Sequence, residues 1–134
     1  MGKFYINKTK TGFNFSLLAT NKEKIAVSSQ VYSTKASCKK GCESVTKFAV
    51  KCIAENKIED QTLVKGTTKL TNPKFEIYLD KAGLFRYRLY ASNGESICMS
   101  EGGYKSKSGC LNGIKSVATN SQNAEYVDET TTSS

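Results

Sequence analysis

Hydrophobic and polar side chains alternate along several short stretches of the chain, most clearly in its second half. In KFEIYLD, residues 74–80, Phe75 and Ile77 fall on one face of an extended chain. Glu76 and Tyr78 fall on the opposite face. A period of two is typical of a strand with one buried and one exposed face. We therefore predict a strand here, followed by a turn in the sequence DKAG.

Two further strands follow the same rule. Over residues 85–90 one face is apolar or aromatic and the other carries the charges, because Phe85, Tyr87 and Leu89 alternate with Arg86, Arg88 and Tyr90. Asn93-Gly94 then gives the strongest short-range signal of a tight hairpin. Residues 96–100 form the third predicted strand, in which we expect Ile97 and Met99 to face inward.

The period changes after residue 105. Cys110, Ile114 and Val117 recur at spacings of four and three, which places them on one stripe of a helix. Ser106 stands just ahead of this helix, where a side-chain oxygen can cap the free backbone N–H groups. A last strand is predicted within residues 124–129, so the order of elements is strand, strand, strand, helix, strand.

The chain contains this series of elements twice. The segment YKSKSGCLNGIKSV at residues 104–117 matches YSTKASCKKGCESV at residues 32–45, with an offset of 72 residues. Upstream of Phe85 the offset is 71, because the second copy has gained one residue near this position. In the first copy Thr34 is the expected helix cap, and a last strand falls less clearly within residues 57–64. The inward positions of the first copy are Phe4, Ile6, Phe13, Phe15, Leu17, Ile25, Val27, Cys38, Cys42, Val45 and Ala49.

Glycine stands at the same helix position in both copies, as Gly41 and Gly113. A glycine inside a helix costs about 1 kcal/mol relative to alanine, so its presence in both copies indicates the close approach of another element. We expect that element to be the other helix.

Each copy has too little sheet and helix to bury a core alone, so we expect the two copies to merge their sheets. The chain divides into a first repeat at residues 1–65, a linker at 66–72, a second repeat at 73–129 and a disordered tail at 130–134.

The second copy resembles a known family. An aromatic first strand, a Gly turn, the strand FRYRL, the hairpin ASNG, the step SEGGY and the helix entry KSKS follow one another as in the YegP-like domain, the DUF1508 or UPF0339 group. The resemblance covers residues 73–128 nearly end to end. The first copy is a degenerate version, in which Asn21-Lys22 replaces the Asn-Gly turn.

The resemblance implies an α+β fold of two tandem β3-αβ repeats. They would form one continuous, mainly antiparallel sheet with both helices on one face, and the C-terminal strand of each repeat would be swapped to the other. In this family such units are arranged as a tandem pair or as a dimer. We expect this chain to be a bacterial protein and a monomer, with its two repeats arranged as an internal pseudo-dimer. No set of catalytic residues comes with the resemblance, and a fold by itself does not establish a function.

The chain is basic, with 20 Lys and Arg against 12 Asp and Glu, a net charge of +8. The first 60 residues hold 11 lysines and 5 acids, so the excess is concentrated there. This charge favours nucleic acid, another anionic ligand or an acidic protein partner. No apolar run is long enough to cross a membrane, and the amino terminus has no apolar signal-peptide core, so we expect a cytoplasmic protein that does not contact membranes.

Little in the sequence points to catalysis. The chain has no His, the side chain most often used for acid–base chemistry at neutral pH. Its five cysteines, Cys38, Cys42, Cys52, Cys98 and Cys110, are an odd number without a CxxC pair. Buried thiols in a reducing compartment explain them better than disulfides or zinc. We expect no enzyme activity, no metal and no cofactor.

Two basic surfaces are candidate binding sites. The first consists of Tyr78, Arg86, Arg88 and Tyr90 on the outer face of the sheet, where arginines among tyrosines could contact phosphates and stack on bases. The alternative is that these side chains only cover the sheet. The second surface is the first helix, with Lys35, Lys39 and further lysines; its alternative is an ordinary solvated helix face.

The sequence therefore supports two hypotheses. The first is a small, non-enzymatic module that binds nucleic acid or another anionic ligand. The alternative is a protein-interaction or structural module without nucleic-acid binding.

Overall fold

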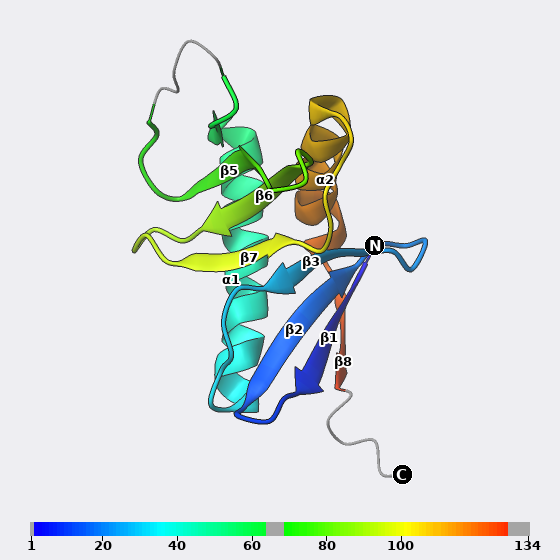
Figure 1. Ribbon diagram of the computed structural model, residues 1–134. Coiled ribbons are helices and arrows are strands. Elements are labelled where there is room, and N and C mark those ends of the chain that lie inside the picture. Colours follow the sequence, from blue (N-terminus) through cyan, green and yellow to red (C-terminus); the bar gives the residue numbers. More distant parts are fainter. Residues whose placement is uncertain (1, 64–68, 129–134) are drawn as a thin grey trace.

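The described residues form a mixed sheet of eight strands that is backed by two helices. The computed structural model describes residues 2–63 and 69–128. Figure 1 shows both helices on the same side of the sheet, so the opposite face carries neither of them. In chain order the elements are β1 (Lys3–Lys8), β2 (Phe13–Leu18), β3 (Lys24–Ser28), α1 (Lys35–Ala54), β4 (Ile58–Asp60), β5 (Lys74–Leu79), β6 (Phe85–Tyr90), β7 (Ser96–Ser100), α2 (Lys107–Ser121) and β8 (Glu125–Asp128).

The two repeats share the sheet and exchange their last strands. The strand order is β4-β5-β6-β7-β3-β2-β1-β8. β3 and β7 pair antiparallel at the centre and join the repeats. β8 of the second repeat runs parallel to β1 of the first, and β4 of the first runs parallel to β5 of the second. The predicted continuous sheet and the predicted strand swap are both confirmed.

Aromatic rings on the inner face of the sheet pack in equivalent pairs in the two repeats. Phe4 and Phe15 meet edge to face with ring centroids 5.9 Å apart, and Phe75 and Tyr87 do the same at 6.2 Å. All four side chains are buried. The predicted helix stripes cover them, since the following residues are fully buried: Cys38, Cys42, Val45, Ala49, Cys110, Ile114 and Val117. Removal of this apolar surface from water stabilises the shared core.

Both helices begin at the residues expected from the sequence. The Thr34 hydroxyl accepts a hydrogen bond from Ser37 N, and the Ser106 hydroxyl accepts one from Gly109 N, each at 3.0 Å. These side chains satisfy backbone N–H groups that lack partners within the helix.

For the third strand of each repeat, the prediction of which side chains face inward is partly wrong. A bulge between Leu89 and Tyr90 shifts the register against β7, so Ile97 and Cys98 are both buried and Met99 faces outward. The equivalent bulge in the first repeat buries Ala26 and turns Val27 outward. A bulge inserts one unpaired residue, and beyond it each side chain changes face.

The expected reason for the two helix glycines is also wrong. A Cβ atom at Gly113 would lie 2.5 Å from the hydroxyl oxygen of Tyr104, and one at Gly41 would meet the hydroxyl of Tyr32 equally closely. Both tyrosines lie in the segment between a third strand and a helix. The glycines therefore make room for a tyrosine of their own repeat, and contact between the helices is not what requires them.

One row of side chains crosses the whole sheet on the face away from the helices. From β8 to β4 the strand registers align Val127, Tyr5, Ser16, Val27, Met99, Arg88, Glu76 and Glu59. Val27 and Met99 are equivalent residues of the two repeats and pair with each other, so the approximate two-fold axis passes between them. Tyr5 and Ser16 therefore hold the positions that Glu76 and Arg88 hold in the second repeat.

The predicted linker and tail fall partly or wholly outside the described residues. Residues 66–68 of the linker and the tail at 130–134 are not described. Within the linker, Leu70 N donates a hydrogen bond to Glu59, which ties this segment to β4. Among the described helices, none is long and apolar enough to cross a membrane.

Candidate anion-binding surfaces

The sheet register brings the predicted arginine and tyrosine side chains together. Tyr78 pairs with Arg86 across β5 and β6, Glu76 pairs with Arg88, and Lys74 pairs with Tyr90. Each pair points to the face away from the helices. The four predicted residues therefore lie together, and Glu76 and Lys74 lie among them on the same face.

Arg86 is held by an acid of its own repeat. Its Nε donates to Asp80 Oδ2 at 2.6 Å. The other oxygen of Asp80 accepts backbone N–H groups of Ala82 and Leu84, at 2.9 and 3.0 Å. The hydrogen bond from Arg86, followed by these backbone bonds, lowers the pKa of Asp80 below its ordinary value. Arg86 therefore stabilises the turn between β5 and β6, and its charge is already matched.

Arg88 is enclosed by an acid and a ring. Its Nε lies 3.4 Å from Glu76 Oε1, in an ion pair without a hydrogen bond, and its guanidinium lies 4.0 Å from the centroid of the Tyr78 ring. Tyr90 donates from its hydroxyl to the same oxygen of Glu76 at 3.3 Å. About a third of the Arg88 side chain stays exposed, at 35%. A ligand phosphate at Arg88 would therefore compete with Glu76.

A buried carboxylate, Glu59, continues this network beside Glu76. It accepts hydrogen bonds from Lys74 Nζ, Leu70 N and Gln61 Nε2, all at 2.8 Å. Burial by itself would raise the pKa of Glu59, but these hydrogen bonds and the charge of Lys74 outweigh it and lower the pKa to about 2. The outer face of the second repeat is thus electrically balanced, which favours the interpretation that its long side chains cover the sheet.

Glu59 and Glu76 were not among the candidate residues predicted from the sequence. The alternation in KFEIYLD places Glu76 on the same face as Tyr78, so the sequence was sufficient to predict that Glu76 lies on the outer face. Glu59 had no comparable signal, because its place beside β5 depends on the swap of β4.

The two predicted helix lysines are attached to the swapped strand β8. Lys35 Nζ donates to Asp128 Oδ2 at 3.1 Å, and Lys39 Nζ lies 5.2 Å from the centre of the Tyr126 ring. Both side chains remain on the surface. Their contacts hold β8 against α1, so neither side chain is fully available to a ligand.

A different set of α1 lysines faces solvent. Lys40, Lys47 and Lys51 recur at spacings of seven and four, which aligns them in a row along one face of the helix. All three are exposed, and within residues 2–63 and 69–128 neither Lys40 nor Lys47 takes part in an ion pair. Lys47 Nζ lies 5.3 Å from the centroid of the Phe48 ring, which is on the same helix. Lys51 lies 3.8 Å from Glu55, with both side chains about half exposed, a weak surface pair.

A groove runs beside this row, between α1 and the β6–β7 hairpin of the other repeat. Its volume is about 380 Å³. Tyr32 and Phe48 supply aromatic surface, and Lys40 lies at the helix side. The hairpin supplies Ser92, Asn93 and Glu95. We call this the α1 groove.

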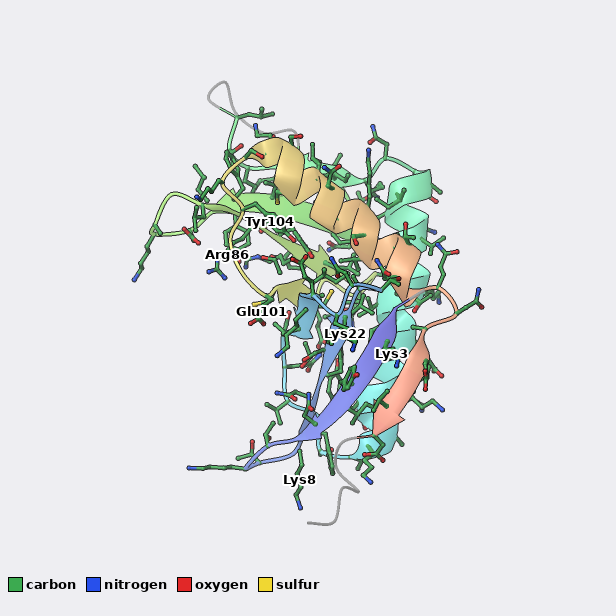
Figure 2. All side chains as sticks on the ribbon, turned by 90° about the vertical axis from the view of Figure 1, so that its right-hand side faces the viewer. Lys3, Lys8, Lys22, Arg86, Glu101 and Tyr104 are labelled. Atoms are coloured by element: carbon green, nitrogen blue, oxygen red, sulfur yellow. The ribbon has the colours of Figure 1, made fainter. Side chains whose placement is uncertain are left out.

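A smaller hollow lies on the outer face, at the turn between β2 and β3. It has a volume of about 190 Å³ and is lined by Lys3, Tyr5, Leu18, Ala19, Thr20 and Lys22. Figure 2 shows Lys3 and Lys22 near one end of β1, with Lys8 at the other end. We call this the Lys22 hollow.

All five cysteines are buried free thiols. Burial raises the pKa of Cys38, Cys52 and Cys110 to about 11, and that of Cys98 to about 12. Nucleophilic and metal-binding cysteines need the opposite shift. Among the described residues no group of three Cys, Asp or Glu side chains is placed to hold a metal ion.

Comparison with known proteins identifies the family. The model of the family described as "Domain of unknown function (DUF1508)" matches residues 9–51 and 80–128, one segment in each repeat. The chain belongs to this family. The resemblance predicted from the sequence is confirmed.

Relatives of one-repeat and two-repeat length both occur. A UPF0339 protein of Agrobacterium fabrum is 57% identical over 58 residues, which are 43% of this chain and 92% of that protein. A UPF0339 protein of Bordetella pertussis is 33% identical over 129 residues, 96% of each chain. A UPF0339 protein of the archaeon Methanosarcina acetivorans is 52% identical over 54 residues, 40% of this chain and 91% of that protein. Family membership therefore does not establish a bacterial origin.

A solved structure of the family has the same fold. The solution NMR structure of yegP, a protein of unknown function from E. coli, is similar with a TM-score of 0.73 at 26% identity, and the match covers 98% of this chain and 96% of that one.

Proposed function

We propose that the protein is a cytoplasmic, non-catalytic module that binds nucleic acid or another polyanion through α1. The proposal keeps the anionic ligand predicted from the sequence but moves the interface. Lys40, Lys47 and Lys51 replace Arg86 and Arg88 as the principal contacts, because acids already balance the two arginines.

The distribution of ion pairs carries this proposal. Before residue 61, eight of the eleven lysines form no ion pair within the described part of the chain, whereas only Glu23 and Glu43 among the five acids are unpaired. The resulting positive field lies on the first repeat, and a polyanion gains free energy there by releasing its counterions.

The α1 groove gives the same surface a means to contact bases. Phe48 and Tyr32 line it next to Lys40, and single-stranded nucleic acids bind where basic side chains follow the backbone and aromatic rings stack on bases. Both rings are partly exposed. A single strand along α1 could therefore make charge contacts and stacking contacts together.

The non-catalytic and cytoplasmic parts of the proposal rest on the cysteines. Five free, buried thiols suit a reducing compartment, and their raised pKa values leave them protonated at neutral pH. In this proposal the protein acts as a monomer, with the second repeat in the place of a partner subunit.

The test is a fluorescence titration of labelled single-stranded RNA and DNA with the full chain. We expect micromolar binding near 50 mM salt that weakens at about 200 mM. Combined substitution of Lys40, Lys47 and Lys51 by Gln should lower the affinity about tenfold or more and reduce the salt dependence by about two counterions.

The matched control removes the same charge from the second repeat, by Lys81→Gln, Lys105→Gln and Lys115→Gln together. This variant should lose clearly less affinity. Arg86→Gln with Arg88→Gln should bind within about twofold of the unchanged chain, because both side chains lie on the sheet face away from α1. Absence of binding near 50 mM salt, or equal losses in the two triple variants, would refute the proposal.

One observation favours a second function, a protein-interaction module. The centre of the outer face holds Val27 and Met99, both partly exposed in a row that no helix covers. An acidic protein partner would suit the charge of the first repeat. Affinity capture from the native cell that returns nucleic acid, but no protein in stoichiometric amount, would contradict this alternative.

A further inference from the structure

The turn between β2 and β3 has a lysine where its counterpart has glycine. Lys22 has a φ angle of 70°, and Gly94, the equivalent residue in the β6–β7 turn, has a φ of 87°. The turns share their hydrogen bonds, since Lys22 N donates to Ala19 O at 2.9 Å and Gly94 N donates to Ala91 O at 3.0 Å. Glycine adopts this left-handed conformation without steric cost, whereas a lysine there is strained.

Strained residues of this kind cluster at binding sites and active sites, where the surrounding structure holds them in place. Lys22 lines the Lys22 hollow together with Lys3, so two basic residues border about 190 Å³ of space. Figure 2 shows the two lysines at the same end of the sheet. The strained lysine therefore adds a positive charge to this hollow, and a ligand for that charge would account for its presence.

Carboxylates at the hollow are sparse. Lys3 lies 3.8 Å from Glu125, and the side chains are 52% and 66% exposed, so this pair is weak. Lys22 forms no ion pair with any described residue. Lys3 and Lys22 both line one small space, so an anion bound there would be attracted by two positive charges.

In the second repeat, acidic residues neutralise the positive charge at the position equivalent to the Lys22 hollow. Lys74 is the counterpart of Lys3 and is bound by Glu59 at 2.8 Å. Glu76 stands where the hollow has Tyr5, and Gly94 stands where it has Lys22. Relative to its counterpart, the hollow has one more cation and lacks both buried acids.

We propose that the Lys22 hollow binds a phosphate group, as free phosphate or as a phosphate monoester. Two lysines match the charge of a phosphate dianion, and Tyr5 adds a hydroxyl group to the residues of the lining. Leu18 and the ring of Tyr5 offer apolar surface to the carbon end of a monoester. The hollow lies on the sheet face away from α1, so this site is separate from the proposed polyanion surface and can fail independently of it.

The experiment is an NMR titration of the ¹⁵N-labelled full chain with sodium phosphate and, separately, with phenyl phosphate. Sodium chloride at the same ionic strength is the reference. We expect saturable shifts of the backbone amides of Lys3, Tyr5 and Lys22 that chloride does not produce. Tighter binding of phenyl phosphate assigns the site to monoesters, and equal binding assigns it to free phosphate.

The decisive variant is Lys22→Gly, which copies the turn of the second repeat. It removes the charge and the strain together, so we expect a chain at least as resistant to heat as the original that binds phosphate about tenfold more weakly. A loss of binding in a stabilised chain cannot be attributed to misfolding.

Lys10→Gln is the matched control, because it removes one exposed lysine from the turn between β1 and β2. It should leave phosphate affinity within about twofold. The triple α1 variant should also keep the phosphate site, which separates this proposal from the polyanion proposal. Shifts no larger than those with chloride, or unchanged affinity in Lys22→Gly, would overturn it.

Discussion

Tyr87 in β6 donates a hydrogen bond from its phenol to the backbone carbonyl oxygen of Ile25 in β3, at 2.5 Å. The bond lies in the core and joins the two repeats. In the first repeat the residue equivalent to Tyr87 is Phe15, which has no hydrogen to donate. This cross-repeat bond is therefore made in one direction only.

Replacement of Tyr87 by Phe should destabilise the whole sheet. The buried Ile25 oxygen would lose its donor, so we expect a loss of about 1–3 kcal/mol in the free energy of unfolding. Urea denaturation followed by circular dichroism measures it. The control is Tyr78→Phe on the outer face, which should change stability by less than about 0.5 kcal/mol because it keeps the ring that contacts Arg88. Equal effects of the two variants would show that the bond contributes nothing.

Replacement of Gly113 by Ala should reverse the usual effect of alanine in a helix. Alanine normally stabilises a helix by up to about 1 kcal/mol relative to glycine. Here the added Cβ would lie 2.5 Å from the Tyr104 hydroxyl, so we expect a destabilisation of about 1–3 kcal/mol. Asn112→Ala, one residue earlier and exposed, should leave stability unchanged or raise it. A stabilised Gly113→Ala chain would mean that Tyr104 moves aside freely.

Glu59 should make stability depend on pH in the acidic range. Its pKa is lowered to about 2 in the folded chain, so its contribution is complete above its unfolded pKa and is lost as the pH falls through the folded value. The unfolding free energy should therefore decline from about pH 5 to pH 2.

The variant Glu59→Gln tests this dependence. It should be less stable than the original chain at pH 7, and the difference should shrink toward pH 2. Glu101→Gln changes an exposed acid that forms no ion pair within the described residues, so it should leave the pH profile unaltered. Parallel curves for Glu59→Gln and the original chain would contradict the assigned role.

The first repeat should not be stable as a monomer. In residues 1–72 alone, β1 would lack its neighbour β8, and β4 would lack β5. We expect this fragment to be unfolded, or to dimerise by pairing β4 of each copy with β1 of the other. Light scattering and circular dichroism distinguish these states from a folded monomer, which would refute the shared core.

The sequence determined the elements and their order because their signals are local. Alternation over residues 74–80, the spacing of Cys110, Ile114 and Val117, and the cap at Ser106 each depend on neighbours within a few residues. The internal repeat then required two equivalent units, and the family resemblance supplied the strand swap.

Only the tertiary structure decided which charges are available. Arg86 and Arg88 stood out in the sequence because the first repeat has no counterpart for them, yet Asp80 and Glu76 balance them across the sheet. The bulges that turn Met99 outward, and the tyrosine that requires Gly113, likewise depend on neighbours distant along the chain. Pairing between strands brings these groups together, and a local pattern carries no information about it. The lysine at position 22 was visible from the start, but its strained turn and the hollow beside it exist only in the folded chain.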